Sequence, residues 1–328
     1  MKALVLTQVG TPYTLHVETD IEIPEPAAGE VRIKVMSSSI NPVDYKFAKN
    51  GTTLQLPHIL GIDAAGIVDA VGHDVTTWKK GDRVISLTNL WRWGGFAEYV
   101  VVDANSISAI PEQLDFNAAA TIPCAGITAW QALYRKAPLH AGQRILVNGA
   151  GGGVGGFVVQ LAKLMGLEVY ATASSEPERI KALGADHIIN YKQDNIVERI
   201  HALTEGRGVD AVIDLISSET SLQLATVLRH NGHLISVSGR IDQNPIPSFT
   251  KAISIHEVAL GFAYQHGDDE NLRDIAAGGE FLATLMANGK LDPMIQNVIT
   301  LDELENGLHQ AEHGKTQGKV VIEIAKAS

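Results

Sequence analysis

Cysteine is almost missing from this sequence, because Cys124 is its one cysteine among 328 residues. A single cysteine can form no intramolecular disulfide, and it excludes a four-cysteine structural zinc site. Sparse cysteine is typical of a reducing compartment, so we predict a cytoplasmic protein. Long apolar runs are missing too. No segment reaches the roughly 18 consecutive apolar residues of a membrane span, and Met1–Gly10 lacks the apolar core of a signal peptide.

Positively charged residues are also fewer than negatively charged ones. The 26 Lys and Arg residues are outnumbered by 37 Asp and Glu residues, which gives a formal net charge of −11. No run rich in Lys and Arg occurs, so neither a nucleic acid nor a membrane is an expected partner. The hydrophobic content of 45% is ordinary for a folded protein. The length allows about two domains.

Glycine is concentrated where a strand meets a helix. The apolar segment Arg144–Asn148 runs into Gly149–Gly156, where six of eight residues are glycine. Apolar residues then recur at helical spacing, and a second apolar segment, Glu168–Ala173, follows at the distance of a βαβ unit. In a dinucleotide site, glycines make a tight turn and let the backbone approach a pyrophosphate at the helix N-terminus. We therefore predict a nicotinamide-dependent oxidoreductase rather than a flexible linker.

More than one register of the glycine motif fits. Gly151, Gly153 and Gly156 match G-x-G-x-x-G, whereas a looser A-x-G-G-V-G pattern begins at Ala150. We expect the cofactor to lie against the whole turn, whose members are Ala150, Gly151, Gly152, Gly153, Val154 and Gly155.

The chain has two kinds of pattern. Up to about residue 122, short strands alternate with Gly and Pro turns. These strands are expected at Lys2–Leu6, Val31–Ser37, Ala64–Val71, Arg83–Leu87 and Ala97–Val102. From about 124 to 262, strands alternate with helices. The six strands are expected at Arg144–Asn148, Glu168–Ala173, His187–Asn190, Ala211–Leu215, His233–Val237 and Val258–Gly261.

This alternation predicts an α/β protein with a doubly wound parallel sheet of six strands. Helices are expected at Val154–Leu167, Glu176–Leu183, Asn195–Leu203 and Glu219–His230, the second capped by Ser175 and stopped by Gly184. Later helices are expected near Asn271–Asn288 and Asp302–Glu312. A last strand, Lys319–Ile324, should return to the first domain. The predicted domains are therefore 1–123 with 263–328, and 124–262.

The end of the second nucleotide-domain strand favours NADPH. An NAD site usually carries Asp or Glu there for the ribose 2′-hydroxyl, whereas this chain has Ser174 and Ser175. Two serines remove repulsion of a 2′-phosphate, and Arg179 with Tyr191 or Lys192 would complete the pocket. The alternative is that the serines only cap a helix and Arg179 is solvated.

Several motifs, in order along the whole chain, resemble one family. They are Ser39–Lys46 (SINPVDYK), Gly61–Val68 (GIDAAGIV), Gly94–Tyr99 (GGFAEY), the Gly149–Gly156 turn, Leu183–Asp186 (LGAD) and Gly318–Val321 (GKVV). The chain resembles the zinc-free quinone oxidoreductase branch, which includes zeta-crystallin-like proteins, of the medium-chain dehydrogenase/reductase superfamily. The resemblance implies a GroES-like β-rich catalytic domain, a Rossmann domain and a cleft between them.

The resemblance also implies site residues and an assembly. Asn41 would face the nicotinamide cleft as an amide donor to the substrate oxygen. Asp44 would either act there or hold the loop, and Tyr45 would supply a proton unless it is a surface residue. Thr128 would lie near the nicotinamide and pyrophosphate. A homodimer or homotetramer is expected, with Val258–Gly261 as a plausible edge-strand contact.

The zinc ligands of the related alcohol dehydrogenases are not expected here. Asn41 stands at the first cysteine position, Gly61-Ile62-Asp63 replaces Gly-His-Glu, and Cys124 is the remaining thiol. One thiol and one carboxylate are fewer than the three protein ligands of a catalytic zinc, so we predict no metal. Scattered histidines (His58, His73, His140 and His187) are expected at the surface or in loops.

Without a Lewis acid, oxidation of alcohols is difficult, whereas an activated acceptor takes hydride readily. The sequence therefore predicts an NADPH-dependent reductase of quinones. An enone or 2-alkenal double-bond reductase is the nearest alternative. A non-catalytic NADPH-binding protein is the alternative from another class. Trp91 and Trp93 are expected either to cover planar acceptors or to pack on their own domain.

Overall fold

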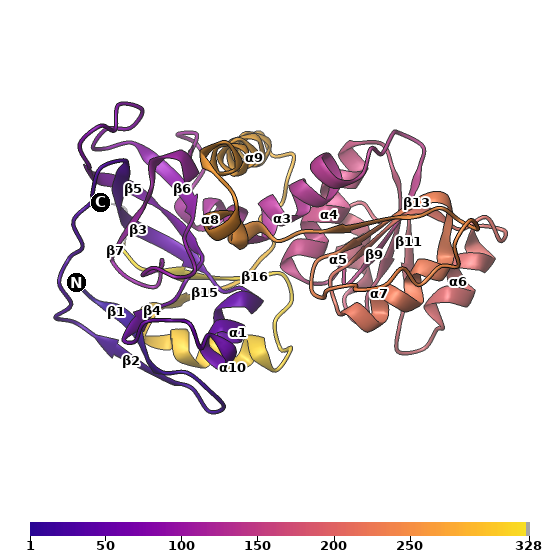
Figure 1. Cartoon of the computed structure of the whole chain (residues 1–328), viewed down its shortest axis with the longest axis horizontal. Helices are drawn as coiled ribbons and strands as arrows, with labels where there is room; N and C mark the ends of the chain where they lie inside the picture. Colours follow the sequence, from indigo (N-terminus) through magenta and orange to yellow (C-terminus); the bar gives the residue numbers. More distant parts are fainter. Residues whose placement is uncertain (326–328) are drawn as a thin grey trace. The chain divides into compact units, whose positions relative to one another are not determined.

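The structure is a computed structural model, and it describes residues 1–325. The chain divides into two compact units, which are described separately. Unit 1 contains Met1–Ile127 and Leu260 onward, and unit 2 contains Thr128–Ala259. Unit 2 is thus inserted into unit 1 along the chain (Figure 1).

Unit 2 is built on a parallel sheet of six strands in the order β11-β10-β9-β12-β13-β14. The strands are β9 (Arg144–Asn148), β10 (Glu168–Thr172), β11 (His187–Ile189), β12 (Val209–Asp214), β13 (Leu228–Ser236) and β14 (Ser254–Glu257). Numbered within the unit, this is the 3-2-1-4-5-6 order of a Rossmann fold, so the predicted doubly wound sheet is confirmed. Most residues of the central strands β9, β10 and β12 are apolar and buried, as expected for a sheet covered on both faces.

Helices connect the strands of unit 2. They are α4 (Gly153–Leu164), α5 (Pro177–Ala182), α6 (Ile196–Leu203) and α7 (Ser218–Leu224), with the short η4 (Ala225–Val227). Gly184 stops α5 as predicted, since its φ of +115° is strained for other residues. A continuous helical segment leads in from unit 1, through η2 (Ile122–Gly126), α3 (Ile127–Gln131) and η3 (Ala132–Lys136).

Three local predictions in unit 2 were wrong. The sixth strand is Ser254–Glu257, not Val258–Gly261. It lies at the edge of the sheet and is only partly buried, so its sequence does not need a continuous apolar run. The predicted helix Glu219–His230 ends at Leu224, and β13 already begins at Leu228. The residue preceding α5 is Glu176 in the left-handed region, so Ser175 is not its N-cap.

β14 (Ser254–Glu257) forms one edge of the six-stranded sheet. β14 pairs with β13 on one side only, so its backbone groups on the other side form the end of the sheet. An edge strand of this kind is a site for pairing with a second chain. The predicted contact at Val258–Gly261 therefore shifts to Ser254–Glu257, and the oligomeric state stays a prediction.

Unit 1 contains two sheets. The larger has the order β15-β16-β3-β5-β6-β8, with β7 also pairing β3, and the smaller has the order β2-β1-β4. The strands are β1 (Ala3–Gln8), β2 (Thr14–Glu18), β3 (Glu30–Ser39), β4 (His58–Ile59), β5 (Asp63–Val71), β6 (Arg83–Leu87), β7 (Tyr99–Asp103), β8 (Ile107–Ala109), β15 (Ile295–Thr300) and β16 (Lys319–Glu323). The five strands expected before residue 122 are present, and β2, β4 and β8 are additions.

The chain's last strand returns to unit 1, as predicted. β16 pairs antiparallel with β3, matching Val321 with Ser39. The helices of unit 1 are α1 (Pro42–Asn50), α2 (Phe116–Ala119), α8 (Ala263–His266), α9 (Asp269–Ala287) and α10 (Leu304–Glu312), with short turns η1 (Ala104–Ser106), η5 (Leu260–Phe262) and η6 (Leu301–Glu303). Pairing of distant segments places the residues before α1 beside the C-terminal strand.

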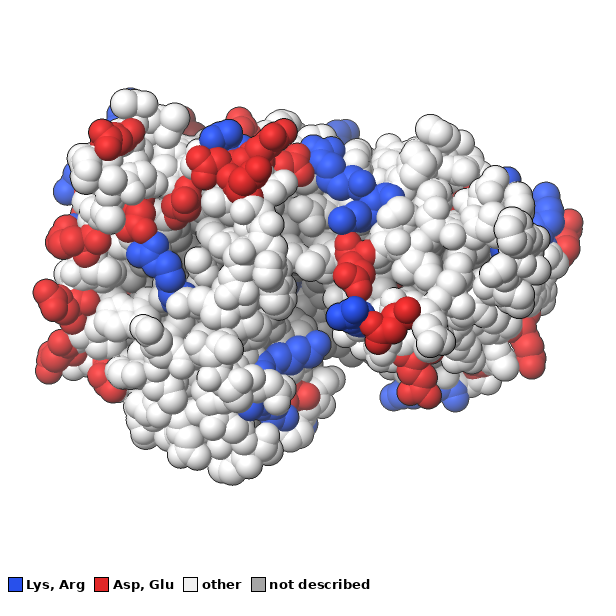
Figure 2. All heavy atoms as spheres, viewed as in Figure 1, with Lys and Arg blue, Asp and Glu red and all other residues white. Residues whose placement is uncertain are grey.

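Within residues 1–325, no helix is long and apolar enough to cross a membrane. Figure 2 shows Lys and Arg side chains interspersed with Asp and Glu on the face in view.

Candidate functional site

The glycine turn of unit 2 lies between β9 and α4. Gly149 has a φ of +95°, and its N–H donates to Thr172 Oγ1 at 2.9 Å, which ties the turn to β10. A Cβ on Gly155 would meet the Gly149 carbonyl oxygen at 2.2 Å, so this position cannot accept a side chain without movement. The backbone of α4 at Gly155 therefore packs directly against Gly149, which precedes the helix.

The other side of the turn is open. A Cβ on Gly151 would meet nothing within 4 Å, and one on Gly152 would meet only the Gly149 oxygen at 3.7 Å. Gly152 is the N-cap of α4 and supplies no side-chain cap. The first N–H groups of α4 and the exposed backbone therefore fit a pyrophosphate. Ala150 is buried, whereas Gly153 and Val154 are half-buried at the start of α4.

The loop after β10 carries the residues predicted to bind the cofactor ribose, and that role stays a prediction. Ser174 Oγ donates to the Tyr191 hydroxyl at 2.8 Å, and the ring of Tyr191 is half exposed. Arg179, on α5, donates from its guanidinium to the Gly151 carbonyl oxygen at 2.9 Å. Its Nε also binds Glu176 at 2.8 Å. The structure thus joins Arg179 to the glycine turn, and Ser175 lies in the same loop. Thr128 is buried in α3.

In unit 1, a buried polar cluster surrounds Asp63 at the start of β5. Its Oδ1 accepts the Cys124 N–H at 2.7 Å. Its Oδ2 accepts from Asn41 Nδ2 at 2.6 Å, and also from the Ser39 hydroxyl. Lys319 Nζ lies 3.5 Å from the same oxygen. Asp63 is fully buried, and each of its two carboxylate oxygens accepts from at least one donor of this chain.

Asn41 is completely engaged in this cluster. Its Oδ1 accepts from Lys319 Nζ at 2.7 Å, and its Nδ2 donates to Asp63 and to the Ser39 carbonyl oxygen at 3.1 Å. A lysine ammonium only donates and a carboxylate only accepts, so the amide has one possible orientation. Both amide hydrogens are used within the chain. The role of Asn41 as a donor to substrate stays a prediction, and its visible role is to organise the cluster.

Asp44 holds the beginning of α1. One oxygen accepts the Asn41 N–H at 2.8 Å, and the other accepts the Ile62 N–H at 3.1 Å. Burial raises the pKa of Asp44 to about 7; the two N–H groups oppose this shift, and the nearby charge of Asp63 adds to it. Asp44 therefore joins the chain before α1 to the chain before β5.

Tyr45 follows on α1 and is half-buried. Burial raises its pKa, and the negative charges of Glu312 and Asp44 raise it further. The phenol therefore stays protonated at neutral pH and can donate a hydrogen bond.

An aromatic run lies beside these residues. Trp91 makes edge contacts with Phe47 on α1 and with Phe262 on η5, at ring-centre distances of 5.7 and 5.3 Å. Phe262 is 44% exposed and stacks on His266 at 6.2 Å. Trp91 thus packs against two aromatic residues of unit 1, and its role in covering a planar acceptor stays a prediction.

Apolar side chains pack around Gly261, which directly precedes Phe262. A Cβ on Gly261 would meet Leu90 at 2.8 Å and Ile62 at 3.5 Å, so these three residues pack together. Ile62 is the residue that stands where zinc dehydrogenases carry histidine. The apolar segment Val258–Gly261, which was expected as a strand, thus continues into this packing.

The cluster does not fit a zinc ion. Burial raises the pKa of the Cys124 thiol, and the charge of Asp63 adds to the shift. Asp63 has no unoccupied oxygen, and a lysine ammonium lies beside it. Among residues 1–325, no group of three or more His, Cys, Asp or Glu side chains is arranged to hold a metal. His58 is buried in β4, contrary to the surface position expected for it.

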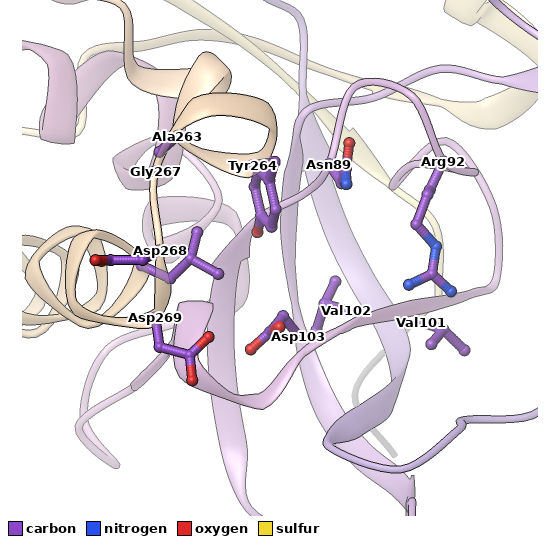
Figure 3. Close-up of a pocket in the computed structure, with 11 residues that line it drawn as sticks. Asn89, Arg92, Val101, Val102, Asp103, Ala263, Tyr264, Gly267, Asp268 and Asp269 are labelled. Carbon is purple, nitrogen blue, oxygen red and sulfur yellow. The ribbon is translucent and has the colours of Figure 1, made fainter.

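Figure 3 shows a separate cavity in unit 1, with a volume of about 260 Å³. It is lined by residues of the loop after β6, of β7 and of the 263–272 segment. Two of its carboxylates are helix caps, since Asp103 accepts the Asn105 N–H and Asp268 accepts the N–H groups of Glu270 and Asn271. Its Arg92 pairs with Glu30. These charges are used in holding the fold.

Comparison with known proteins decides the family. Residues 27–112 match the alcohol dehydrogenase GroES-like domain, and residues 153–274 match the zinc-binding dehydrogenase family. Quinone oxidoreductase from Sus scrofa is 33% identical over 98% of this chain and 97% of that protein, and the Homo sapiens protein is 31% identical over the same shares.

The chain belongs to the quinone oxidoreductase family of the medium-chain dehydrogenase/reductases.

Solved structures agree with this assignment. The quinone oxidoreductase from Coxiella burnetii has a TM-score of 0.82 at 30% identity, and each chain covers 99% of the other. An alcohol dehydrogenase superfamily protein from Novosphingobium aromaticivorans has a TM-score of 0.88 at 28% identity, covering 99% of this chain and 100% of that one. This family member is an oxidoreductase that uses a nicotinamide cofactor.

Sequence reasoning missed Lys319 in this quinone oxidoreductase family member. It was noted only within the Gly318–Val321 motif of a strand. A lysine in an otherwise apolar, buried strand was the available signal, because lysine is rarely buried without a partner. Phe47 and Phe262 were missed as well, since nothing local indicates that they meet Trp91.

Proposed function

We propose that this protein is a zinc-independent, NADPH-dependent reductase that transfers hydride to quinones. The observation that carries the proposal is the donor set around Asp63. An amide stands at the first zinc position, and it is bound by the Lys319 ammonium rather than being open to a metal. Without a Lewis acid, the acceptor must itself be electrophilic, as a quinone is.

The contacts of unit 2 support NADPH as the reductant. When bound, NADPH supplies the hydride. The backbone of Gly151 and Gly152 and the N-terminus of α4 would hold its pyrophosphate. Ser174, Tyr191 and Arg179 present hydroxyl and guanidinium donors after β10, where an NAD site carries a carboxylate. The nearby Glu176 carboxylate is paired with Arg179, which reduces its repulsion of a 2′-phosphate.

Side chains of unit 1 support a planar acceptor. Tyr45 stays protonated, so it is our candidate to donate a hydrogen bond or proton to the acceptor oxygen as negative charge develops there. The run of Phe47, Trp91 and Phe262 offers ring surface, and Ile62 with Leu90 excludes water beside it. Asn41 and Asp44 hold the segment from which Tyr45 projects.

The test compares acceptor classes directly. Initial rates of NADPH oxidation by the metal-free protein are measured with small quinones and with short-chain 2-alkenals. We expect quinone turnover to dominate, with NADPH preferred to NADH. Turnover confined to alkenals would replace the proposal with double-bond reduction. Tight NADPH binding with no turnover of either class would replace it with a non-catalytic binding role. Dependence of activity on added zinc would contradict the zinc-independent mechanism.

A further inference from the structure

Lys319 is a buried cation that the proposed reaction does not use directly. Its side chain is 3% exposed, although lysine is seldom buried unless it is paired. It is the first residue of β16, close to the end of the chain. Burying an ammonium group is costly unless acceptors nearby replace its lost hydration, so its partners must be identified.

Strand register explains how Lys319 reaches the site. β16 runs antiparallel to β3, with Val321 opposite Ser39. The Ile40 N–H donates to the Val320 carbonyl oxygen at 2.9 Å, which extends this pairing by one residue. The next step of the same register places Lys319 opposite Asn41. The pairing of two strands far apart in sequence thus delivers a positive charge to the residue before α1.

The Lys319 ammonium donates to acceptors in the chain before α1 and at the start of β5. It donates to Asn41 Oδ1 at 2.7 Å and to the Ile40 carbonyl oxygen at 3.2 Å. Its third contact is with Asp63 Oδ2 at 3.5 Å. A lysine has three N–H donors, so each contact can use one of them. Lys319 therefore joins the chain before α1 to the start of β5.

This arrangement fixes the Asn41 amide. With Oδ1 held by Lys319, the Nδ2 group must face Asp63 and the Ser39 carbonyl oxygen. Without the ammonium, Oδ1 would be a buried acceptor lacking its charged partner, and the carboxylate of Asp63 would lack its nearby counter-charge. Asp44 would then face that charge across the same segment, since its carboxyl group already interacts unfavourably with Asp63.

We propose that Lys319 is a positioning residue for the reaction. Its ammonium holds Asn41 and Asp63 in one arrangement and thereby fixes the beginning of α1, which bears Tyr45. The expected change in kcat rests on the proposed function, whereas the expected change in hydrogen exchange of segment 39–47 does not. Lys319 touches neither the acceptor nor the cofactor in this scheme, and it acts through Asn41.

The test is a double-mutant cycle with Lys319→Met, Asn41→Ala and the combined variant. Lys315→Met is the matched control, because Lys315 is exposed and precedes the same strand. For each protein we would measure kcat and KM for a quinone, the NADPH dissociation constant, and backbone hydrogen exchange in segments 39–47 and 31–36.

Loss of positioning predicts a specific pattern. We expect kcat of Lys319→Met to fall roughly 10- to 100-fold, since displacing a reacting group by a small distance has effects of that size. NADPH affinity should be unchanged, because the glycine turn belongs to unit 2. Exchange should accelerate in 39–47 and not in 31–36. The double variant should be no slower than the slower single variant, because both changes break one network.

Other results would overturn the inference. Effects of Lys319→Met and Asn41→Ala that multiply in the double variant would mean that the two residues act separately. Unchanged exchange in 39–47 would exclude positioning, whichever acceptor the protein reduces. If the wild-type protein reduces no quinone, the proposed function fails, and the exchange data still decide the role of Lys319.

A second variant addresses loss of folding. Lys319→Met combined with Asp63→Asn removes both charges, so no buried charge is left without a partner. The amide NH2 introduced at position 63 would face the Cys124 N–H or Asn41 Nδ2 unless the Asn41 amide turns over, so thermal unfolding first checks that this variant is folded. The folded variant should keep the low kcat. A wild-type kcat in this variant would show that only charge neutrality is needed, and would overturn the positioning role.

Discussion

Ser174 and Tyr191 are linked side chain to side chain, with the serine Oγ donating to the tyrosine hydroxyl at 2.8 Å. Both residues follow neighbouring strands of the Rossmann sheet, since β10 pairs with β11. Because the carboxyl ends of parallel strands lie at one edge of a sheet, the contact places two hydroxyl groups where a cofactor ribose is expected. Arg179, which also binds the glycine turn, brings a positive charge to the same loop.

Replacing Ser174 with Asp should shift preference from NADPH towards NADH. The new carboxylate would repel a 2′-phosphate and would accept a hydrogen bond from a ribose 2′-hydroxyl. The measurement is the ratio of kcat/KM for the two cofactors. Ser248→Asp is the control, since it adds the same charge at an exposed position of the same unit. A ratio that moves equally in both variants, or in neither, would contradict the assigned role of Ser174.

Alanine at two glycines of the turn should have opposite consequences. Gly155→Ala should lower stability by about 1–3 kcal/mol, because its Cβ would meet the Gly149 oxygen at 2.2 Å. Gly151→Ala should keep the wild-type melting temperature, since its Cβ meets nothing within 4 Å. It should nevertheless weaken NADPH binding by intruding on the pyrophosphate. Thermal unfolding and cofactor fluorescence distinguish the two effects. NADPH affinity unchanged in Gly151→Ala would place the pyrophosphate elsewhere.

Asp44 should make stability fall as pH rises towards neutrality. Its pKa in the folded protein is about 7, whereas an unfolded chain gives about 3.9. The folded state therefore holds a proton that the unfolded state has lost between these values. This contribution to stability is complete below about pH 4 and is lost as pH rises through about 7. Urea unfolding at several pH values should show the decline, and Asp44→Asn should flatten it.

Glu168→Gln provides the contrasting control. Hydrogen bonds from Arg144, Tyr170 and His187 outweigh burial and hold the pKa of Glu168 at about 2. Its contribution to stability is present above its unfolded pKa of about 4.3 and is lost only as pH falls towards 2. Glu168 itself should therefore add no slope between about pH 5 and pH 8, and both variants are compared in a His187→Asn background because His187 lies 3.0 Å from Glu168. An equal change of slope in both variants would exclude Asp44 as the cause.

Trp91→Leu should reduce quinone turnover selectively. Trp91 joins Phe47 to Phe262, so its loss removes ring surface and disorders both neighbours. We expect kcat/KM for multi-ring quinones to fall about tenfold, and that for a short alkenal to fall less. Trp93→Leu is the matched control, because Trp93 lies in the same loop and is 36% exposed. Equal losses for both acceptor classes would show that Trp91 only supports the fold.

Much of the nucleotide domain was predictable from local pattern. The boundaries of β9 match the predicted Arg144–Asn148, because a strand buried on both faces is a continuous apolar run. The edge strand β14 was misplaced, because its four residues are half-buried at most and carry no such run. The contact of Ser174 with Tyr191 follows from the same pattern, since parallel strands end at one edge of their sheet.

Unit 1 was less predictable. Asn41, Asp44 and Tyr45 were singled out from a motif, but the motif did not indicate that the Asn41 amide is fully bonded within the chain. The aromatic run joins residues 47, 91 and 262, which no spacing rule relates.

The sequence alone determined the parallel nucleotide sheet, its glycine turn and the missing zinc ligands. These follow from local periodicity, from glycine's lack of a side chain, and from residue chemistry. Only the tertiary structure decided which side chains meet Asn41 and Trp91. Lys319 and Asn41 are 278 residues apart, and they meet because the register of β16 against β3 sets them opposite each other. Strand register is a property of the assembled sheet, so neither segment specifies it by itself.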